Sequence, residues 1–245
     1  TAPAAPAPAA NSIAVLPFVN MSADEDNAFF SDGITEELLN VLVRVDGLQV
    51  ASRTSSFAFR DSDLGSRAIA GELRVSHLLE GSVRKSGNQV RITAQLIDAV
   101  NDRHLWSETY DRDLNDIFAI QDEIANAIVK ALRAELPAAG GEVAAVKVEA
   151  DTQNLTAYEL YLKARELFIA RSEMSQSVKL FERVVELDPS FARGWEGLAA
   201  AAGVAEGWGV RDRDYTTLSR LAAERALALD PGLSMPWAAL SLQEQ

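Results

Sequence analysis

The chain has 245 residues, 48% of them hydrophobic, which is enough to bury the core of one large domain or of two modest ones. Its 36 acidic and 23 basic residues give a net charge of −13, and no basic patch is visible, so direct binding to nucleic acid is excluded. The absence of cysteine excludes disulfides and thiolate metal sites. No apolar run reaches the ~18 residues typical of a membrane-spanning helix.

The first ten residues, TAPAAPAPAA, are alanine and proline apart from Thr1, a composition typical of an extended, semi-rigid linker. They lack the basic start and the apolar centre of a signal peptide. Because the chain does not begin with methionine, we expect that a segment upstream has been removed. A membrane segment or a catalytic domain would fit that position.

The next stretch predicts a buried strand followed by a helix. Residues 12–18, SIAVLPF, form a short apolar run, which is typical of a strand buried on both faces. After an acidic loop over residues 20–30, Asp32 is expected to cap a helix that Asp46 and Gly47 end. The residues expected to face the sheet recur at helical spacing: Ile34, Leu38, Leu42 and Val45.

A second strand and a second helix are predicted before residue 75. Residues 48–51 favour a short strand, and residues 52–60, SRTSSFAFR, favour a polar and aromatic loop. A short helix follows, marked by the apolar residues Leu64, Ala68, Ile69 and Leu73.

An antiparallel meander is predicted over residues 76–112, because apolar and polar side chains alternate along two successive stretches and a third strand, LWSETY at 105–110, follows. Gly87 and Asn88 are expected to supply the positive φ angles of a tight hairpin between the first two strands. A second turn at Asn101 and Asp102 leads into the third strand. One face of the meander is therefore expected to be buried.

A long helix is predicted after the meander, with Asp113 or Asn115 as its cap and Pro137 just beyond its end. Its apolar stripe consists of Ile117, Ile120, Ile124, Ile128, Ala131 and Leu132. The order of elements predicts an α/β domain over residues 11–140, with a mixed sheet and flanking helices.

Several segments of this domain together resemble the TolB amino-terminal-like domain, also called FlgO-like, over residues 11–136. They are SIAVLPF, SDGITEELLN, SRTSSFAFR, LLEGSVR, VRITAQLIDA and HLWSETYDRDLNDIFAIQDEIA. The resemblance implies a domain of bacterial signalling proteins without enzymatic activity of its own. It implies a place downstream of an adenylate cyclase domain, or of a CadC-like winged-helix domain and a membrane span, with tetratricopeptide repeats following.

The carboxy-terminal part repeats itself after a linker over residues 141–154. VELDPSFARGWEGLA at 185–199 matches ALALDPGLSMPWAALS at 226–241, and an Asp-Pro pair breaks a helix in each copy. Close helix approach is expected at the small residues Ala164, Ala199 and Ser241. The pattern resembles tetratricopeptide helix pairs over residues 155–245, truncated in the third unit. The glycine-rich residues 203–214 are predicted to be an inserted loop.

A partner-binding groove is predicted on the first helix of each repeat. The resemblance to tetratricopeptide repeats maps its lining to Tyr158, Tyr161, Arg165, Arg193 and Glu196. Aromatic and arginine side chains suit a groove that holds a peptide. The alternative is that Tyr158 and Tyr161 pack against the linker or the α/β domain.

A ligand pocket is the second candidate site. Asn20 and Ser22 follow the first strand, and Arg53, Thr54 and Ser55 follow the second. If those strands are parallel neighbours, both loops meet at one edge of the sheet, where α/β proteins bind ligands. An arginine among hydroxyls can hold a small anion or a nucleotide. The alternative is a turn whose hydroxyls cap the backbone.

No glycine-rich phosphate loop, zinc-ligand spacing or nucleophile elbow is present, so we expect no catalytic residue, metal or cofactor. His77 and His104 lie on or beside strands and are expected to be structural.

The prediction is a non-catalytic sensory and protein-interaction module of a larger bacterial signalling protein. Its helical repeats would bind a protein or peptide, and its α/β domain would sense a signal or form a homodimer. The alternative is an anion or nucleotide receptor. The Ala/Pro linker, in a family often placed after a membrane span, favours the periplasmic side of a membrane-anchored protein over the cytoplasm.

Overall fold

The computed structural model describes residues 9–24, 27–135, 152–208, 210, 212–233 and 236. The chain forms two compact units, Thr1–Val148 and Glu149–Gln245. Residues 1–8 of the first predicted linker, residues 141–151 of the second, and Ser241 lie outside the described residues. No helix in the described ranges is long and apolar enough to cross a membrane.

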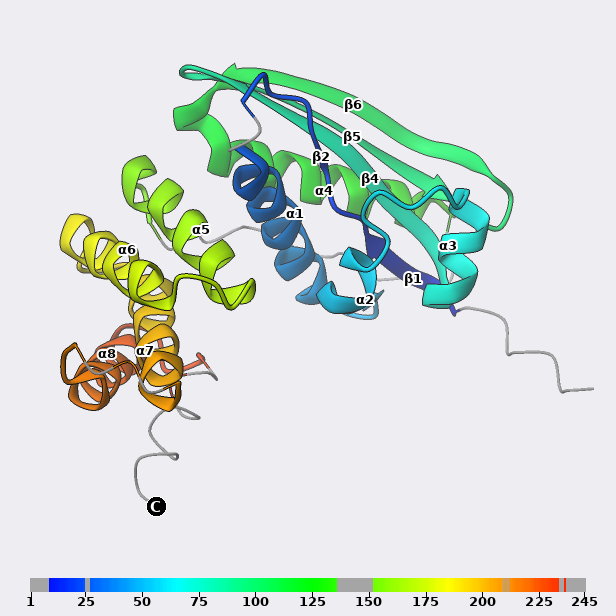
Figure 1. Cartoon of the computed structure of the whole chain (residues 1–245). Coiled ribbons are helices and arrows are strands. Elements are labelled where there is room, and N and C mark those ends of the chain that lie inside the picture. The colour runs from blue at the N-terminus through cyan, green and yellow to red at the C-terminus, as the bar shows by residue number, and fades with distance from the viewer. Residues whose placement is uncertain are drawn as a thin grey trace, which may run out of the picture. The chain divides into compact units, whose positions relative to one another are not determined.

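Within the described part of the first unit, six strands form one mixed sheet in the order β3-β1-β4-β5-β6, with β2 also paired to β4 (Figure 1). The strands are β1 (Ala9–Val15), β2 (Val19–Asn20), β3 (Gln49–Val50), β4 (Val75–Ser86), β5 (Gln89–Asp98) and β6 (Arg103–Asp113). The predicted α/β class with a mixed sheet and flanking helices is confirmed for this unit.

The meander is the longest continuous part of the sheet. β4 pairs antiparallel with β5 from His77↔Asp98 to Ser86↔Gln89, and β5 pairs antiparallel with β6. At the first turn Gly87 has a φ of 55°, whereas Asn88 does not have the positive φ predicted for it. One left-handed residue is therefore sufficient for this turn. At the second turn Asp102 has a φ of 55°.

The amino-terminal strand crosses the sheet in two pieces. β1 runs parallel to β3 and to β4 as far as Val15↔Leu79, and β2 resumes the pairing with β4 at Val19↔Ser82. The sequence predicted the first piece and missed the second. Pro17 lies in the interruption, where its missing N–H removes a donor that a strand would need.

Helices cover the two faces of the sheet. They are α1 (Ala28–Val43), α2 (Arg53–Phe57), α3 (Ser66–Leu73) and α4 (Ile117–Glu135), which a 3-10 turn over Leu114–Asp116 precedes. α1 contacts β1, β2 and β3, α4 contacts β5 and β6, and the two helices contact each other. The predicted stripe of α4 is buried apart from Ala131, which is partly exposed.

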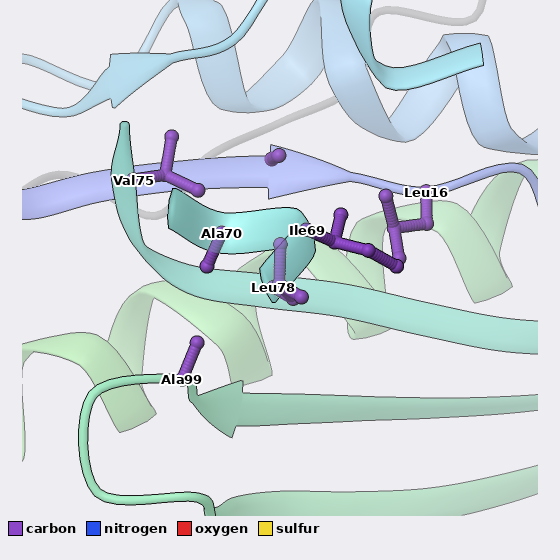
Figure 2. Close-up of a cluster of buried hydrophobic side chains, with 7 residues drawn as sticks. Leu16, Ile69, Ala70, Val75, Leu78 and Ala99 are labelled. Carbon is purple, nitrogen blue, oxygen red and sulfur yellow. The ribbon is translucent and has the colours of Figure 1, made fainter. Parts of the chain in front are cut away.

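The other face of the sheet carries α3. Ile69 and Ala70 of α3 pack with Leu16 and Leu78 in a buried cluster (Figure 2). Leu79 is also fully buried, and because neighbouring strand residues point to opposite faces, it faces the α1 and α4 side.

The start of α1 was predicted wrongly. The helix begins at Ala28, with Asn27 rather than Asp32 before its first turn. Phe30 is fully buried, and its burial favours a helix that begins before the predicted cap, so the last three residues of the predicted loop, 28–30, belong to α1. Asp32 lies inside the helix, where both of its carboxylate oxygens accept hydrogen bonds from Arg60, at 2.6 and 2.7 Å.

The predicted loop over residues 52–60 contains the short helix α2. Ser52 caps it, because the Ser52 Oγ accepts a hydrogen bond from the Ser55 backbone N–H at 3.2 Å. The hydroxyl pattern read as a loop therefore marks a helix start.

The Phe18 ring packs closely against Gly81 of β4. Phe18 is 1% exposed, and its backbone N–H donates to the Thr35 Oγ1 of α1 at 2.9 Å. A Cβ atom on Gly81 would lie 2.7 Å from the Phe18 ring and would overlap the Thr93 carbonyl oxygen. The interruption between β1 and β2 thus depends on a missing side chain in the middle of β4.

The described part of the second unit contains α5 (Leu155–Ile169), α6 (Met174–Leu187), α7 (Ala192–Gly207) and α8 (Tyr215–Leu229). α5 packs on α6, α6 on α7, and α7 on α8. Equivalent hydrogen bonds join α6 to α5 and α8 to α7: the Ser177 Oγ donates to the Ala164 carbonyl at 2.8 Å, and the Ser219 Oγ donates to the Ala199 carbonyl at 2.9 Å. The predicted close approach at these two alanines is confirmed.

Of two predictions about where the helices of this unit end, one is confirmed and one is partly wrong. Asp188 and Asp230 end α6 and α8 with the same φ of −140°, which confirms that the Asp-Pro pairs break the helices alike. The predicted loop over 203–214 is wrong in its first half, because α7 continues to Gly207. The alanines before and after Gly203 are buried against neighbouring helices, and this packing outweighs the low helix propensity of glycine.

Replacing Gly81 with alanine is expected to destabilise the α/β unit by about 2–3 kcal/mol, because either Phe18 or the β4–β5 pairing has to move. The matched control is Gly71→Ala in α3, where an added Cβ meets no atom within 4 Å. That change is expected to stabilise the helix by about 0.5–1 kcal/mol. Hydrogen exchange of the β4 and β5 amides measures both effects, and equal protection in the two variants would contradict the role of the Gly81 contact.

Candidate functional site

The predicted groove residues of the helical unit lie on α5 and α7. Tyr161 is 5% exposed, and its ring packs against Phe181 and Phe191, with centroid distances of 6.0 and 5.0 Å. The guanidinium of Arg193 lies 5.7 Å from the centre of the Tyr161 ring. This distance is that of a cation–π contact, so the Tyr161 ring stabilises the position of the Arg193 guanidinium.

Arg165, Arg193 and Glu196 complete the group. Burial lowers the pKa of Arg165 to about 10, the like charge of Arg193 contributes to that shift, and Glu196 opposes it. Arg165 therefore stays positively charged at neutral pH. Two guanidinium groups and one carboxylate therefore interact electrostatically in a partly buried place.

The structure brings together four of the five predicted groove residues: Tyr161, Arg165, Arg193 and Glu196. Tyr158 lies one turn earlier on α5 and is 1% exposed. The phenyl rings that hold Tyr161 come from α6 and from the residue that precedes α7.

The predicted pocket residues take part in local contacts. The Asn20 Oδ1 accepts from the Ser22 N–H at 3.0 Å, and the Ser22 Oγ accepts from the Lys85 N–H at 3.0 Å. Both residues therefore fasten the end of β2. Thr54 and Ser55 lie in the first turn of α2, where the Ser55 hydroxyl accepts from Ser52 at 2.9 Å.

Arg53 is held by an ion pair between α2 and α1. Its Nε donates to Glu36 Oε1, and the Glu36 side chain is 5% exposed. The Arg53 guanidinium also lies 4.0 Å from the centre of the Phe57 ring. The Arg60 guanidinium lies 5.3 Å from the centre of the same ring. Burial lowers the pKa of Arg53, Asp32 raises it, and Arg60 lowers it further. The predicted anion-binding arginine thus has a carboxylate partner within the chain.

β1 and β3, which correspond to the first two strands predicted from the sequence, are parallel neighbours, as the pocket hypothesis required. No hydrogen bond in the described ranges joins Asn20 or Ser22 to the Arg53 turn, however. A cavity of about 930 Å³ beside β4 includes Asn20 in its lining, but not Ser22, Arg53, Thr54 or Ser55.

His77 belongs to a buried polar group at the amino end of the sheet. Its Nδ1 lies 3.0 Å from the Ser76 Oγ and 3.2 Å from the Ser12 carbonyl. The Ser76 Oγ also donates toward backbone carbonyls of β1, at 2.9 Å from that of Ala10. This network satisfies buried polar atoms between β1 and β4. In the ranges that the structure describes, no group of three or more His, Cys, Asp and Glu residues is arranged to hold a metal ion.

A family model matches the first unit, and a relative matches a longer part of the chain. Residues 9–127 match the family model of the second domain of HilA/YgeH-like transcriptional regulators. The putative adenylate cyclase 3 of Rhizobium meliloti (strain 1021) is 42% identical over 197 residues, which are 80% of this chain and 33% of that protein. The chain therefore spans about a third of the length of this relative.

Solved structures with a similar arrangement have low sequence identity. TolB from Acinetobacter baumannii is 19% identical with a TM-score of 0.40, over 52% of this chain and 30% of TolB. The LpoB carboxy-terminal domain from Salmonella enterica is 20% identical with a TM-score of 0.35, over 43% and 84% of the two chains. Lipoprotein GNA1162 from Neisseria meningitidis is 18% identical with a TM-score of 0.36, over 54% and 99%.

A double-mutant cycle tests the interaction of Arg53 with Glu36. Arg53→Met is expected to destabilise the α/β unit by about 2–4 kcal/mol, because it leaves the Glu36 carboxylate buried without its arginine. In the double variant with Glu36→Gln, part of this loss is expected to return, with a coupling free energy of about 1–3 kcal/mol. Urea unfolding of the four proteins gives the coupling. Additive effects would mean that Arg53 does not stabilise Glu36 and remains available to a ligand.

Proposed function

We propose that this chain is a non-catalytic regulatory module of a larger bacterial signal-transduction protein. Two findings support the proposal: the match to a domain of transcriptional regulators, and the 42% identity to a putative adenylate cyclase of which the chain spans about a third. In this proposal any nucleotide cyclase activity belongs to a segment outside the chain, and the two units regulate it.

We further propose that the helical unit is built from tetratricopeptide repeats. The matching serine–alanine hydrogen bonds and the matching Asp-Pro helix ends of the two helix pairs support this assignment. The connection between α7 and α8 is longer than the one between α5 and α6, so the second repeat is a lengthened unit.

The observation that carries the proposed binding role is the positive cluster on α5 and α7. Arg165 and Arg193 lie together on helices that begin the two proposed repeats, and Tyr161 holds Arg193 in place. Two guanidinium groups in a partly buried setting form strong charge-assisted hydrogen bonds with carboxylates. The proposed partner is therefore an acidic peptide segment or a carboxy terminus of another protein.

A peptide array tests this role. The full chain is expected to bind peptides with several Asp and Glu residues, and Arg165→Glu or Arg193→Glu is expected to weaken binding about tenfold or more. Lys163→Glu is the matched control, because it makes the same charge reversal at an exposed position of α5 and is expected to change affinity little. Fluorescence anisotropy gives the affinities.

Peptides in which Asn and Gln replace Asp and Glu provide the second control, and they are expected not to bind. Equal affinity for acidic and amidated peptides would refute the proposed charge recognition. Unchanged binding after deletion of residues 155–245 would refute the role of the helical unit.

For the α/β unit we propose sensing or dimerisation. β6 is the outer strand on one side of the sheet, so its outer edge offers backbone groups to a second strand. Sedimentation of the α/β unit over a range of concentrations distinguishes the two roles. A monomer at all concentrations leaves sensing as the proposed role of this unit.

A further inference from the structure

The cavity beside β4 combines a polar floor with an apolar wall. It lies where the segment between β1 and β2, the loop before α3, and the strands β4 and β5 meet. Its floor contains two cross-strand pairs, Glu80↔Gln95 and Ser82↔Thr93. Because residues two apart on a strand point to the same face, these four side chains form one continuous polar patch on that face of the sheet.

The wall is an extension of the buried cluster under α3. Leu16 and Ile69 belong both to that cluster and to the lining of the cavity, and Figure 2 shows their side chains extending toward each other. Phe59 packs on the cluster and lines the cavity as well. Leu64, which is 50% exposed, adds apolar surface at the rim. A ligand with a hydrocarbon part would therefore find a preformed apolar contact.

The charge inside the cavity is negative. Glu80 is half-buried, and in the part of the chain that the structure describes no Lys or Arg lies within ion-pair distance of its carboxylate. Burial raises the pKa of Glu80, and the electrostatic effect of His104 opposes that shift. Arg60 also lines the cavity, but Asp32 binds its guanidinium through both carboxylate oxygens.

A half-buried carboxylate without a neighbouring Lys or Arg loses part of its hydration, and no ion pair compensates for that loss. A cationic ligand would restore the missing partner, whereas an anion would add repulsion. The hydroxyl oxygens of Ser82 and Thr93 and the amide oxygen of Gln95 can accept hydrogen bonds from the remaining N–H groups of an ammonium or guanidinium.

We propose that this cavity binds a small organic cation, an ammonium or guanidinium group that carries a short hydrocarbon chain. The charged end lies against Glu80, with Ser82, Thr93 and Gln95 as further acceptors. The hydrocarbon chain lies along Leu16, Phe59 and Ile69. This assigns a ligand class to the α/β unit, and it does not depend on the peptide groove of the helical unit.

NMR titration of the isotope-labelled full chain tests the proposal with n-butylammonium and n-butylguanidinium as probes. Saturable shifts are expected at the amides of Gly81, Ser82 and Thr93 and at the side-chain amide of Gln95. n-Butanol and butanoate share the hydrocarbon chain without the positive charge, and they are expected to bind at least about tenfold more weakly. Butanoate binding as tight as that of the cations would overturn the proposal.

Glu80→Gln keeps the size of the side chain, removes its charge, and is expected to weaken cation binding about tenfold or more. Glu72→Gln makes the same change at an exposed position of α3 and is expected to leave binding unchanged. Dispersed amide spectra of both variants establish that they fold. Equal affinity of the Glu80→Gln variant and the wild type would overturn the assignment.

A pH series gives a second, independent measurement on the wild type. Since the ionised carboxylate binds the cation, the affinity for the cation is expected to be highest above the pKa of Glu80 and to fall as the pH drops through that pKa. Because burial raises that pKa, the loss is expected at a higher pH than for an exposed glutamate. Affinity that does not change with pH across this range would also overturn the proposal.

Discussion

Phe18 occupies the space that a side chain on Gly81 would need, and this contact fixes how the amino-terminal strand crosses the sheet. Buried in that place, the phenyl ring contributes about 2–3 kcal/mol of hydrophobic stabilisation. The Phe18 N–H donates to the Thr35 Oγ1, and the Thr35 hydroxyl in turn donates to the Ser31 carbonyl. The interruption between β1 and β2 is therefore tied both to the middle of β4 and to α1. The cavity beside β4 lies next to this interruption, so the contact that shapes the sheet also shapes the cavity.

The helices and strands that could be predicted from the sequence are those whose formation depends on residues close to them in the sequence. The meander is an example, since alternation and one glycine turn define β4 and β5 without reference to the rest of the molecule. β2 was missed because it consists of two residues that pair with Ser82 and Val83, far along the chain. α2 was missed for a similar reason: ion pairs from Arg53 and Arg60 to α1 add to its single cap. Distant partners of this kind leave no periodic signal in the sequence.

The same distinction separates the two sites. Tyr161, Arg165, Arg193 and Glu196 could be grouped from the sequence because a repeated helical pattern places equivalent positions on equivalent faces. The cavity gave no such signal. Its parts come from segments far apart in the chain, and in the sequence Glu80 alternates with apolar residues as an ordinary solvent-facing strand residue does. Only the folded arrangement shows that an apolar wall stands over this glutamate.

The net charge of −13 acts differently on the two proposed ligands. At physiological ionic strength the screening length is about 8 Å, so most of this charge is not felt at either site, and the nearest groups dominate. What remains of the overall field attracts a cation to Glu80 and repels an acidic peptide from the arginine cluster. The arginine cluster therefore has to act at short range, through direct hydrogen bonds in a partly buried place. The low exposure of Tyr161 beneath Arg193 provides such a setting, because a guanidinium held on an aromatic ring loses little freedom when a carboxylate binds.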